Sequence, residues 1–585
     1  MRGQSPPTLK PAAGRETAWW VVLAVALVVA GGRLWGLAHT PFKLLAAARE
    51  VGSIGQFYST IQPSGSGRAV VYSQMTENGV GVFLHETAGG EPKLLIEKRE
   101  KGRGWQRLGM LGWSPEDRLF ALTVPPTEGD PAPPMAQLLL CDGRSGEVVW
   151  RSEIDALVMG FAWLHSNSFA VANSFNHDLS VFEKKREGAW VKRRCFKQVD
   201  TNDWRGLTAV SESALAWHST TNIWRLDLDS GSPQLVWTSE TNRLEGFSYR
   251  RDEKEFRIAC TDEKGWLTVR LRENGQPIFG RSEDRRRCAW VRDEGGLNNL
   301  YVKTEMRLDP FRIEWHGALE DHQGPAAERL GVGKNLFGDS LWLVGTPLDQ
   351  PTGIWRIVLE GGEPRCVVSG LKQPLRHALI RGPAQGGWLT NSAGVPMNWH
   401  LWEPRGRAAN EKRPLIVTQT PYVWLPYAEV AAEAGYCFAM VDRPHWDDPT
   451  IYNWAEDVMA LYNRLANNPQ TDTNRVYVMG TSWDTSFLSS MLQERGALWQ
   501  GLILINPGQF PDVSQLRRGA RVFVAAGREQ GDGRFAEQVR RFQESGLNQG
   551  IQARLCLQAG ADHNPNSIAT WRGRTVEFAR FLNED

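Results

Sequence analysis

The sequence predicts three successive parts: an N-terminal transmembrane helix, an all-β propeller, and a C-terminal α/β domain built on a doubly wound, mostly parallel sheet. Three observations support this prediction. An uncharged run lies near the N-terminus, short aromatic hairpins recur through the middle of the chain, and buried strands alternate with amphipathic helices in the last third. Because 585 residues are too many for one hydrophobic core, more than one domain is expected.

The N-terminal segment, residues 1–40, contains the uncharged run Ala18–Gly32, with three basic residues before it. This run alone is short for a membrane-crossing helix, which takes roughly 20 residues. If Arg33 snorkels to the interface, the apolar segment continues to Ala38 and suffices. No convincing cleavage site follows, so we expect an uncleaved single-pass anchor over residues 18–38. We favour a cytoplasmic N-terminus, which leaves the bulk of the chain outside the cytoplasm.

The middle part, residues 41–370, repeats one design of aromatic residue, polar turn and second strand. Asn222–Trp237 and Gly353–Val368 both read Ile-Trp-Arg-aliphatic-x-Leu before a glycine-containing turn, and Leu138–Trp150 is a looser copy. Their separations fit a unit of roughly 40–45 residues, the size of a four-stranded blade. We therefore expect a propeller of about seven blades. An eighth blade would follow if Phe57–Ser59 began an extra one, and an irregular β-sandwich is the alternative fold.

The last part, residues 371–585, has near-continuous apolar strands between amphipathic helices, which is typical of a parallel sheet covered on both faces. In such sheets the chemistry lies beyond the carboxyl ends of the strands. Three polar residues follow strands in the order Ser482, Asp532 and His563. This is the chain order of the α/β-hydrolase triad, in which the histidine takes the proton of the attacking serine and the carboxylate orients the histidine.

Each member of this trio has a competing interpretation. Ser482 would also suit an ordinary helix N-cap. Glu529 lies in the same loop as Asp532 and competes for the acid role, and both Asp532 and His563 would fit plain loops. His445 is the nearest rival as base, but it follows an earlier strand.

Composition excludes several other functions. The 67 basic and 66 acidic residues nearly cancel and form no basic stripe, so nucleic acid is not an expected partner. The 7 cysteines are odd in number and scattered, which does not indicate a disulfide framework. No CxxC or HExxH motif occurs, so we expect neither a metal nor a cofactor.

Together these features resemble the prolyl oligopeptidase family of serine peptidases, which includes the dipeptidyl peptidases and acylaminoacyl peptidases. Thr390–Pro404 is similar to the hairpin that opens the family's hydrolase domain, and Trp454–Ser482 to its helix, loop and elbow strand. The resemblance covers nearly the whole chain. It implies a propeller joined to an α/β-hydrolase domain, in some members with one N-terminal anchor. It also implies Ser482 as nucleophile, Asp532 as acid and His563 as base.

The nucleophile turn departs from the family pattern, because the two glycines that usually end it are Asp484 and Thr485. Aspartate adds bulk where the strand and the helix approach each other. Its charge would also raise the pKa of the catalytic histidine and weaken that base near neutral pH. We therefore expect Asp484→Gly to raise activity, unless Asp484 holds a structural hydrogen bond that replaces the glycine geometry.

A further departure concerns the oxyanion hole. Thr420–Val423 stands where the family usually has a glycine-rich turn after the first buried strand. We expect the amide of Trp483, just after the nucleophile, as one donor and the amide of Tyr422 as the other. The acid loop is also longer than the family's, and the preceding segment is shorter, so one wall of the pocket is expected to differ.

The sequence thus predicts a membrane-anchored serine hydrolase, foremost a peptidase of the prolyl oligopeptidase type that acts on short substrates. An esterase on the same triad is the alternative within enzymes. A catalytically inactive protein, in which the propeller binds a partner or glycan and the hydrolase domain is scaffold, is the alternative from another class.

Overall fold

The computed structural model describes residues 42–584 with internal gaps. The residues outside the description are 1–41, 55–56, 100–108, 125–134, 156–157, 174–177, 198–204, 240–242, 251–253, 263–264, 274, 276–285, 294–297, 304–310, 315–316, 320–335, 338–339, 348–352, 359–362, 372–374, 377, 379–383, 392–393, 395, 405–410, 420–424, 442–453, 529–533, 549, 560, 562–566 and 585. The predicted anchor over residues 18–38 falls among them. No helix in the described part of the chain has the length and apolar character needed to cross a membrane.

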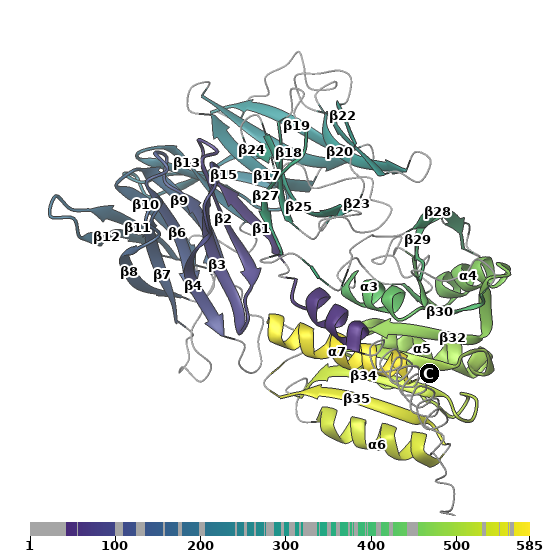
Figure 1. Cartoon of the computed structure of the whole chain (residues 1–585). Coiled ribbons are helices and arrows are strands. Elements are labelled where there is room, and N and C mark those ends of the chain that lie inside the picture. Colours follow the sequence, from purple (N-terminus) through teal and green to yellow (C-terminus); the bar gives the residue numbers. More distant parts are fainter. Residues whose placement is uncertain are drawn as a thin grey trace, which may run out of the picture.

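The first four sheets of the molecule each contain four antiparallel strands. Figure 1 shows them fanning out in the upper half of the molecule, from purple to blue. Their strands are β1 (Phe57–Pro63), β2 (Ala69–Met75), β3 (Gly79–Glu86), β4 (Lys93–Arg99), β5 (Gly109–Trp113), β6 (Leu119–Val124), β7 (Met135–Asp142), β8 (Val148–Asp155), β9 (Val158–His165), β10 (Ser168–Asn173), β11 (Asp178–Lys184), β12 (Trp190–Phe196), β13 (Arg205–Ser211), β14 (Ala214–His218), β15 (Asn222–Asp227) and β16 (Pro233–Thr238). Because β1 pairs with β2, Phe57 begins the first blade and not an additional one.

A six-stranded and a five-stranded sheet complete the described part of the propeller. Their strands are β17 (Arg243–Arg250), β18 (Glu255–Asp262), β19 (Gly265–Arg272), β20 (Arg286–Asp293), β21 (Asn298–Lys303), β22 (Phe311–Glu314), β23 (Gly317–Leu319), β24 (Leu336–Phe337), β25 (Ser340–Pro347), β26 (Gly353–Val358) and β27 (Arg365–Ser369). In the six-stranded sheet, β19 and β20 pair through only two residue pairs. With β17–β19 and β20–β22 taken as two blades, the described sheets form seven blades.

The ring of blades closes where the first and last sheets pack together. One buried cluster contains Val70 and Tyr72 of β2 together with Trp342 of β25 and Ile354 of β26. Apolar burial of this kind is the main stabilising contribution to such a joint. The ends of the propeller sequence are thereby held side by side.

Indole groups join neighbouring blades at a regular interval. Trp113 Nε1 donates a hydrogen bond to the carbonyl of Gln62 at 2.8 Å, across 51 residues. Trp163 Nε1 donates to the carbonyl of Gly112 at 3.3 Å, again across 51 residues. The repeat in this part of the chain is therefore longer than the roughly 40–45 residues that the sequence suggested.

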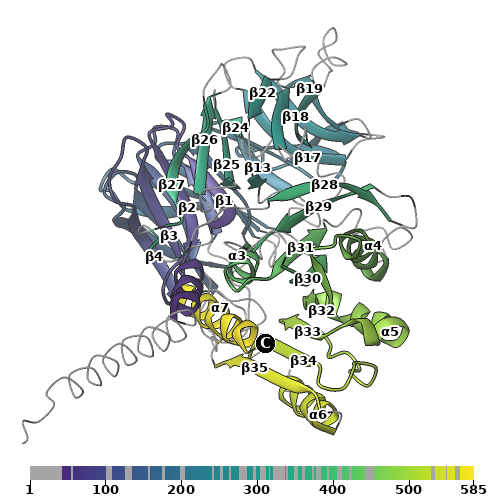
Figure 2. The same cartoon turned by 45° about the vertical axis from the view of Figure 1, so that its right-hand side comes forward.

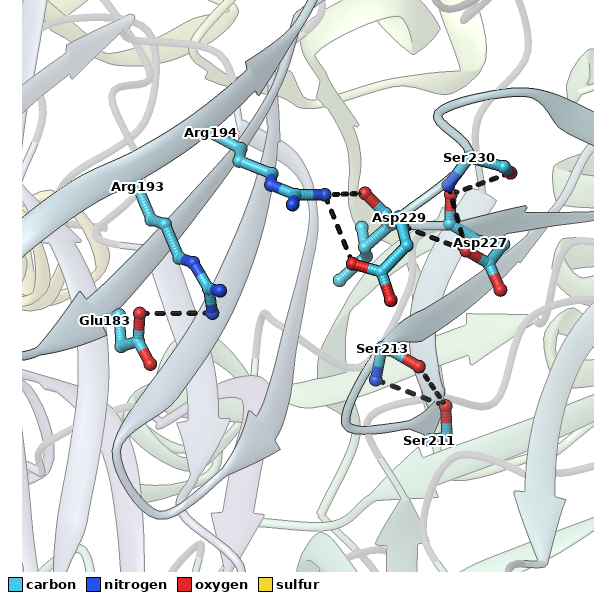
Figure 3. A network of polar contacts seen from close by, with 9 residues as sticks. Glu183, Arg193, Arg194, Ser211, Ser213, Asp227, Asp229 and Ser230 are labelled. Carbon is cyan, nitrogen blue, oxygen red and sulfur yellow. Dashed lines mark hydrogen bonds and ion pairs between the residues drawn. The ribbon is translucent and has the colours of Figure 1, made fainter.

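A charged contact joins β12 to the turn between β15 and β16 (Figure 3). Arg194 donates to the carbonyl of Leu228 and lies 3.4 Å from the carboxylate of Asp229. Within the turn, Asp227 Oδ1 accepts the amides of Asp229 at 2.9 Å and Ser230 at 3.1 Å. The bonds from Ser230 and Asp229 lower the pKa of the Asp227 carboxyl. The turn therefore keeps the conformation that presents Leu228 to the adjacent blade.

The C-terminal domain is built on one eight-stranded sheet with the order β28-β29-β31-β30-β32-β33-β34-β35. β28 pairs antiparallel with β29, and β29 pairs antiparallel with β31. All further pairs in this order, from β31-β30 to β34-β35, are parallel. The strands are β28 (Gln385–Thr390), β29 (Pro396–Trp402), β30 (Arg413–Gln419), β31 (Cys437–Val441), β32 (Thr471–Thr481), β33 (Gly501–Ile505), β34 (Arg521–Gly527) and β35 (Gln552–Gln558). β30, β31, β33 and β34 are buried along their whole length, as expected for strands covered on both faces.

Helices cover both faces of this sheet. They are α3 (Leu425–Glu433), α4 (Trp454–Ala466), α5 (Thr485–Arg495), α6 (Arg534–Asn548) and α7 (Ile568–Asn583). One apolar cluster holds Tyr427 of α3 and Phe578 of α7 against the sheet. A second cluster on the other face holds Val458 of α4, Leu488 of α5 and Phe542 of α6.

The helix formed by residues 42–51, which the sequence analysis assigned to the propeller part, packs on the C-terminal domain (Figure 2). Thr575 Oγ1 of α7 donates to the carbonyl of Ala48 at 2.9 Å. The carboxylate of Glu50 accepts the amides of Arg376 at 3.0 Å and Ala378 at 2.9 Å. This helix therefore joins the chain that precedes the propeller to the domain that follows it.

A second contact joins the first blade to the start of α7. The amide of Ile568, at the first position of α7, donates to the carbonyl of Thr76 at 2.8 Å. Glu77 forms an ion pair with Arg572 one turn further on. The first amides of a helix have no partner within the helix, and here a propeller turn supplies one.

Candidate active site

Ser482 stands at a sharp turn between a central strand and a helix. β32 lies between β30 and β33 and ends at Thr481. A short 3-10 turn, Ser482–Asp484, leads directly into α5. Ser482 has φ of 47°, which is uncommon for a residue with a side chain and marks stored backbone strain. A helix N-cap usually has extended backbone instead, so the geometry favours the nucleophile turn over the N-cap interpretation.

Close contacts hold this turn in place. A Cβ on Gly480 would lie 2.9 Å from Cδ1 of Leu488 on α5, so a larger residue here would require the leucine side chain to shift. The carbonyl of Ser482 accepts the hydroxyl of Thr485 at 2.7 Å and the amide of Gly508 at 3.0 Å. The turn after β33 is therefore attached to the backbone of the candidate nucleophile.

Asp484 occupies one of the expected glycine positions, at the end of the 3-10 turn and directly before α5. Its side chain is fully buried, and its Oδ2 accepts a hydrogen bond from Thr481 Oγ1 at 3.0 Å. The bond joins the last residue of the strand to the last residue of the 3-10 turn. The sequence allowed two roles for Asp484: a residue that impairs the turn by its bulk and charge, or one that holds a structural hydrogen bond. The observed contact matches the second role.

Trp483 follows Ser482 and is the most exposed large apolar side chain in the described chain, at 69%. Its ring meets that of Phe487 edge to face, with the centroids 6.4 Å apart. The side chain thus stands in solvent beside Ser482. The role of its backbone amide as an oxyanion donor stays a prediction.

The other predicted site residues lie outside the described residues. These are Asp532, His563 and Tyr422, together with the rivals Glu529 and His445. Their distances from Ser482 are therefore not part of the structure, and their roles stay predictions.

The described residues include the ends of the strands that precede the predicted acid and base loops. β32, β34 and β35 run parallel, so their carboxyl ends lie at one edge of the sheet. Ser482 follows β32, while Gly527 and Gln558 end β34 and β35. The amide of Arg528 donates to the carbonyl of Gln558 at 2.8 Å, which brings the last two ends together. Loops leaving these strands start from the same edge as the nucleophile turn.

Sequence reasoning missed a buried carboxyl group on α4. Asp457 is fully buried and accepts the side-chain amides of Asn391 at 2.8 Å and Gln419 at 2.6 Å. Burial raises the pKa of this carboxyl to about 6, although both hydrogen bonds oppose the shift. Gln419 is the last residue of β30, and its carbonyl also accepts the indole of Trp454 at 3.3 Å. An acid in the first turn of a helix usually faces solvent, so the sequence carried no signal of this role.

No group of three potential metal-binding side chains occurs among the residues that the structure describes. Two of the buried cysteines, Cys437 and Cys556, have thiol pKa values raised to about 11 by burial. Both thiols are therefore protonated near neutral pH, a form in which a thiol is a poor nucleophile.

Comparison with known proteins defines the class by fold. No family model and no curated protein matches the chain. A solved prolyl endopeptidase structure superposes with a TM-score of 0.59 at 13% identity, covering 93% of this chain and 91% of the other. Puromycin hydrolase gives 0.56 at 13%, covering 92% and 94%. Oligopeptidase B from Leishmania major gives 0.57 at 11%, covering 94% and 90%. The chain therefore has the propeller-plus-hydrolase fold of these peptidases over nearly its whole length.

Proposed function

We propose that this protein is a serine hydrolase of the prolyl oligopeptidase type that cleaves short peptides. The observation that carries the proposal is Ser482 at positive φ, at the end of a central parallel strand, within a fold shared with peptidases. A hydroxyl at such a turn projects from the sheet edge, where a base on a neighbouring loop can reach it.

The roles follow from the chemistry of acyl transfer. Ser482 attacks the scissile carbonyl, His563 takes its proton and later donates it to the leaving amine, and Asp532 holds the imidazole in the required tautomer. The amides of Trp483 and Tyr422 stabilise the oxyanion. The propeller limits access to short substrates.

The proposal includes a single membrane anchor over residues 18–38, with the bulk of the chain outside the cytoplasm. Its support is the uncharged run with basic residues before it. The anchor would keep the hydrolase at a membrane surface.

A fluorophosphonate probe tests the proposal, because it forms a covalent bond only with an activated serine. The expected result is labelling of the wild type at Ser482 and none of Ser482→Ala. His563→Ala should slow labelling strongly while leaving the fold intact. A folded wild-type protein that stays unlabelled would favour the binding protein with a hydrolase scaffold. Panels of peptides and esters then separate a peptidase from an esterase.

A further inference from the structure

Arg574 is a buried cation in the middle of α7. Its side chain is fully buried, and a guanidinium group stays protonated in proteins. Nη1 donates to Asn506 Oδ1 at 2.7 Å, and Nε donates to Gln558 Oε1 at 2.8 Å. Burying such a charge is costly, and an apolar side chain of similar size would often be at least as stable. Stability alone therefore does not explain the buried arginine. We call Arg574, Asn506 and Gln558 the Arg574 cluster.

Asn506 connects the cluster to the nucleophile turn. It directly follows β33, has φ of 47°, and its amide donates to the carbonyl of Ala525 at 2.7 Å. Two residues later, the amide of Gly508 donates to the carbonyl of Ser482 at 3.0 Å. The side chain held by Arg574 thus belongs to the same short turn that holds the backbone of Ser482.

Gln558 connects the cluster to the other two strand ends. It is the last residue of β35, and its Nε2 donates to the carbonyl of Thr570 in the first turn of α7 at 2.8 Å. Its own carbonyl accepts the amide of Arg528 at 2.8 Å. The chain that leaves β34 after Arg528 carries the predicted acid, Asp532, and the chain that leaves β35 carries the predicted base, His563.

We propose that Arg574 is a positioning residue that couples the nucleophile turn to the strand ends from which the predicted acid and base loops depart. This inference rests on the proposed serine hydrolase function. Nucleophile, acid and base come from three different strands, and small errors in their spacing are expensive for catalysis. The rigid guanidinium plane suits this task, because it donates to two amides in fixed directions, which a lysine would not do.

The sharpest test replaces Asn506, since the change leaves Arg574 and its packing in place. Asn506→Gly removes the acceptor, while glycine adopts the observed φ without strain. Asn506→Asp keeps an acceptor for Arg574 at the same point. The rate constant for reaction of Ser482 with the fluorophosphonate should fall roughly tenfold or more in the glycine variant and stay within about threefold in the aspartate variant.

A second pair of variants addresses the arginine itself. Arg574→Met fills the space without donors and should slow probe labelling as Asn506→Gly does. Arg580→Gln is the matched control, because Arg580 lies on the same helix, is 50% exposed and pairs with Glu577 at the surface. The control should label at the wild-type rate. The combined Arg574→Met and Asn506→Gly variant should be no slower than the worse single variant, since Arg574→Met already removes the contact that Asn506→Gly removes.

Hydrogen exchange of the full-length protein tests the coupling without relying on activity. In Asn506→Gly we expect faster exchange both in residues 506–512 and in residues 555–559, the two segments that the cluster joins. Faster exchange that is confined to residues 506–512 overturns the inference. The inference also fails if Asn506→Gly reacts with the probe at the wild-type rate. If the probe never labels the wild-type protein, the proposed hydrolase function is wrong. The exchange measurement still decides whether Arg574 couples the turn after β33 to the end of β35. If Arg574→Met does not fold, the two Asn506 variants give the answer.

Discussion

Replacing Asp484 by glycine should destabilise the C-terminal domain without making the chemical step faster. The carboxylate is fully buried and accepts the hydroxyl of Thr481 at 3.0 Å. Taking a buried acceptor from a hydroxyl costs about 1–3 kcal/mol. Asp484 also has helical backbone, with φ of −60° and ψ of −27°, where glycine costs a further ~0.5–1 kcal/mol relative to alanine.

These two contributions together give a loss of about 2–4 kcal/mol in the free energy of unfolding. For a domain of about 200 residues, each kcal/mol lowers Tm by about 2–4 °C, so a decrease of roughly 5–15 °C is expected. No steric gain offsets this loss. The distance between strand and helix is already set at Gly480, which lies against Leu488. The glycine variant therefore has no closer packing to reach.

Melting curves and steady-state kinetics of the same preparations measure both effects. Asp484→Asn is the control, because it keeps the size and an acceptor oxygen but removes the charge. If the charge weakens the base by raising the pKa of the histidine, this control should gain rate near neutral pH at little change in Tm. A glycine variant that keeps the wild-type Tm and shows a higher kcat would refute the structural role of Asp484.

Three further predictions follow from the site and the chain. Ser482→Ala should keep the fold and lose several orders of magnitude in hydrolysis rate, measured on purified protein, and full activity would eliminate the mechanism. Deleting residues 1–40 should release a soluble protein with both domains, whereas removal of the intact chain from membranes by a carbonate wash would contradict the anchor. Burial raises the pKa of Asp457 in the folded protein to about 6, above the 3.8 that is usual for an aspartate, so its ionisation should cost the wild type up to about 3 kcal/mol as the pH rises from about 4 to about 7. Urea unfolding of Asp457→Asn should lack this loss, and an identical pH dependence in both proteins would show that Asp457 is not its source.

The strand, turn and helix around Ser482 could be predicted because their signals are local. Arg475–Met479 is rich in Val, Tyr and Met, as a buried strand is, Gly480 permits close approach, and the helix pattern begins within a few residues of Ser482. Every relevant neighbour lies inside one short window of sequence. The family resemblance also predicted a hairpin at Thr390–Pro404. The structure has a hairpin there, but its first strand, β28, lies earlier, at Gln385–Thr390, and only β29 falls within the predicted stretch.

The role of Asp484 could not be read from the sequence in the same way. A carboxylate at a glycine position predicts a clash and a harmful charge when only the family pattern is considered. Whether the side chain fits depends on the space beside β32 and on the orientation of the Thr481 hydroxyl. Both are properties of the packed structure. The sequence therefore supplied two opposite alternatives, and the three-dimensional contact favours one of them.

The helix α7 shows why burial is the hardest property to predict. Its sequence holds three arginines that look equivalent on an amphipathic helix: Arg572, Arg574 and Arg580. Arg572 pairs with Glu77 of the first blade, and Arg580 pairs with Glu577 on the same helix. Only Arg574 is fully buried, against two amides that are distant in sequence and adjacent at the strand ends. The periodicity of a helix shows which side chains share a face. The hydrogen-bond acceptors that a buried arginine needs lie at the ends of strands, so they can be identified only once the sheet topology is known.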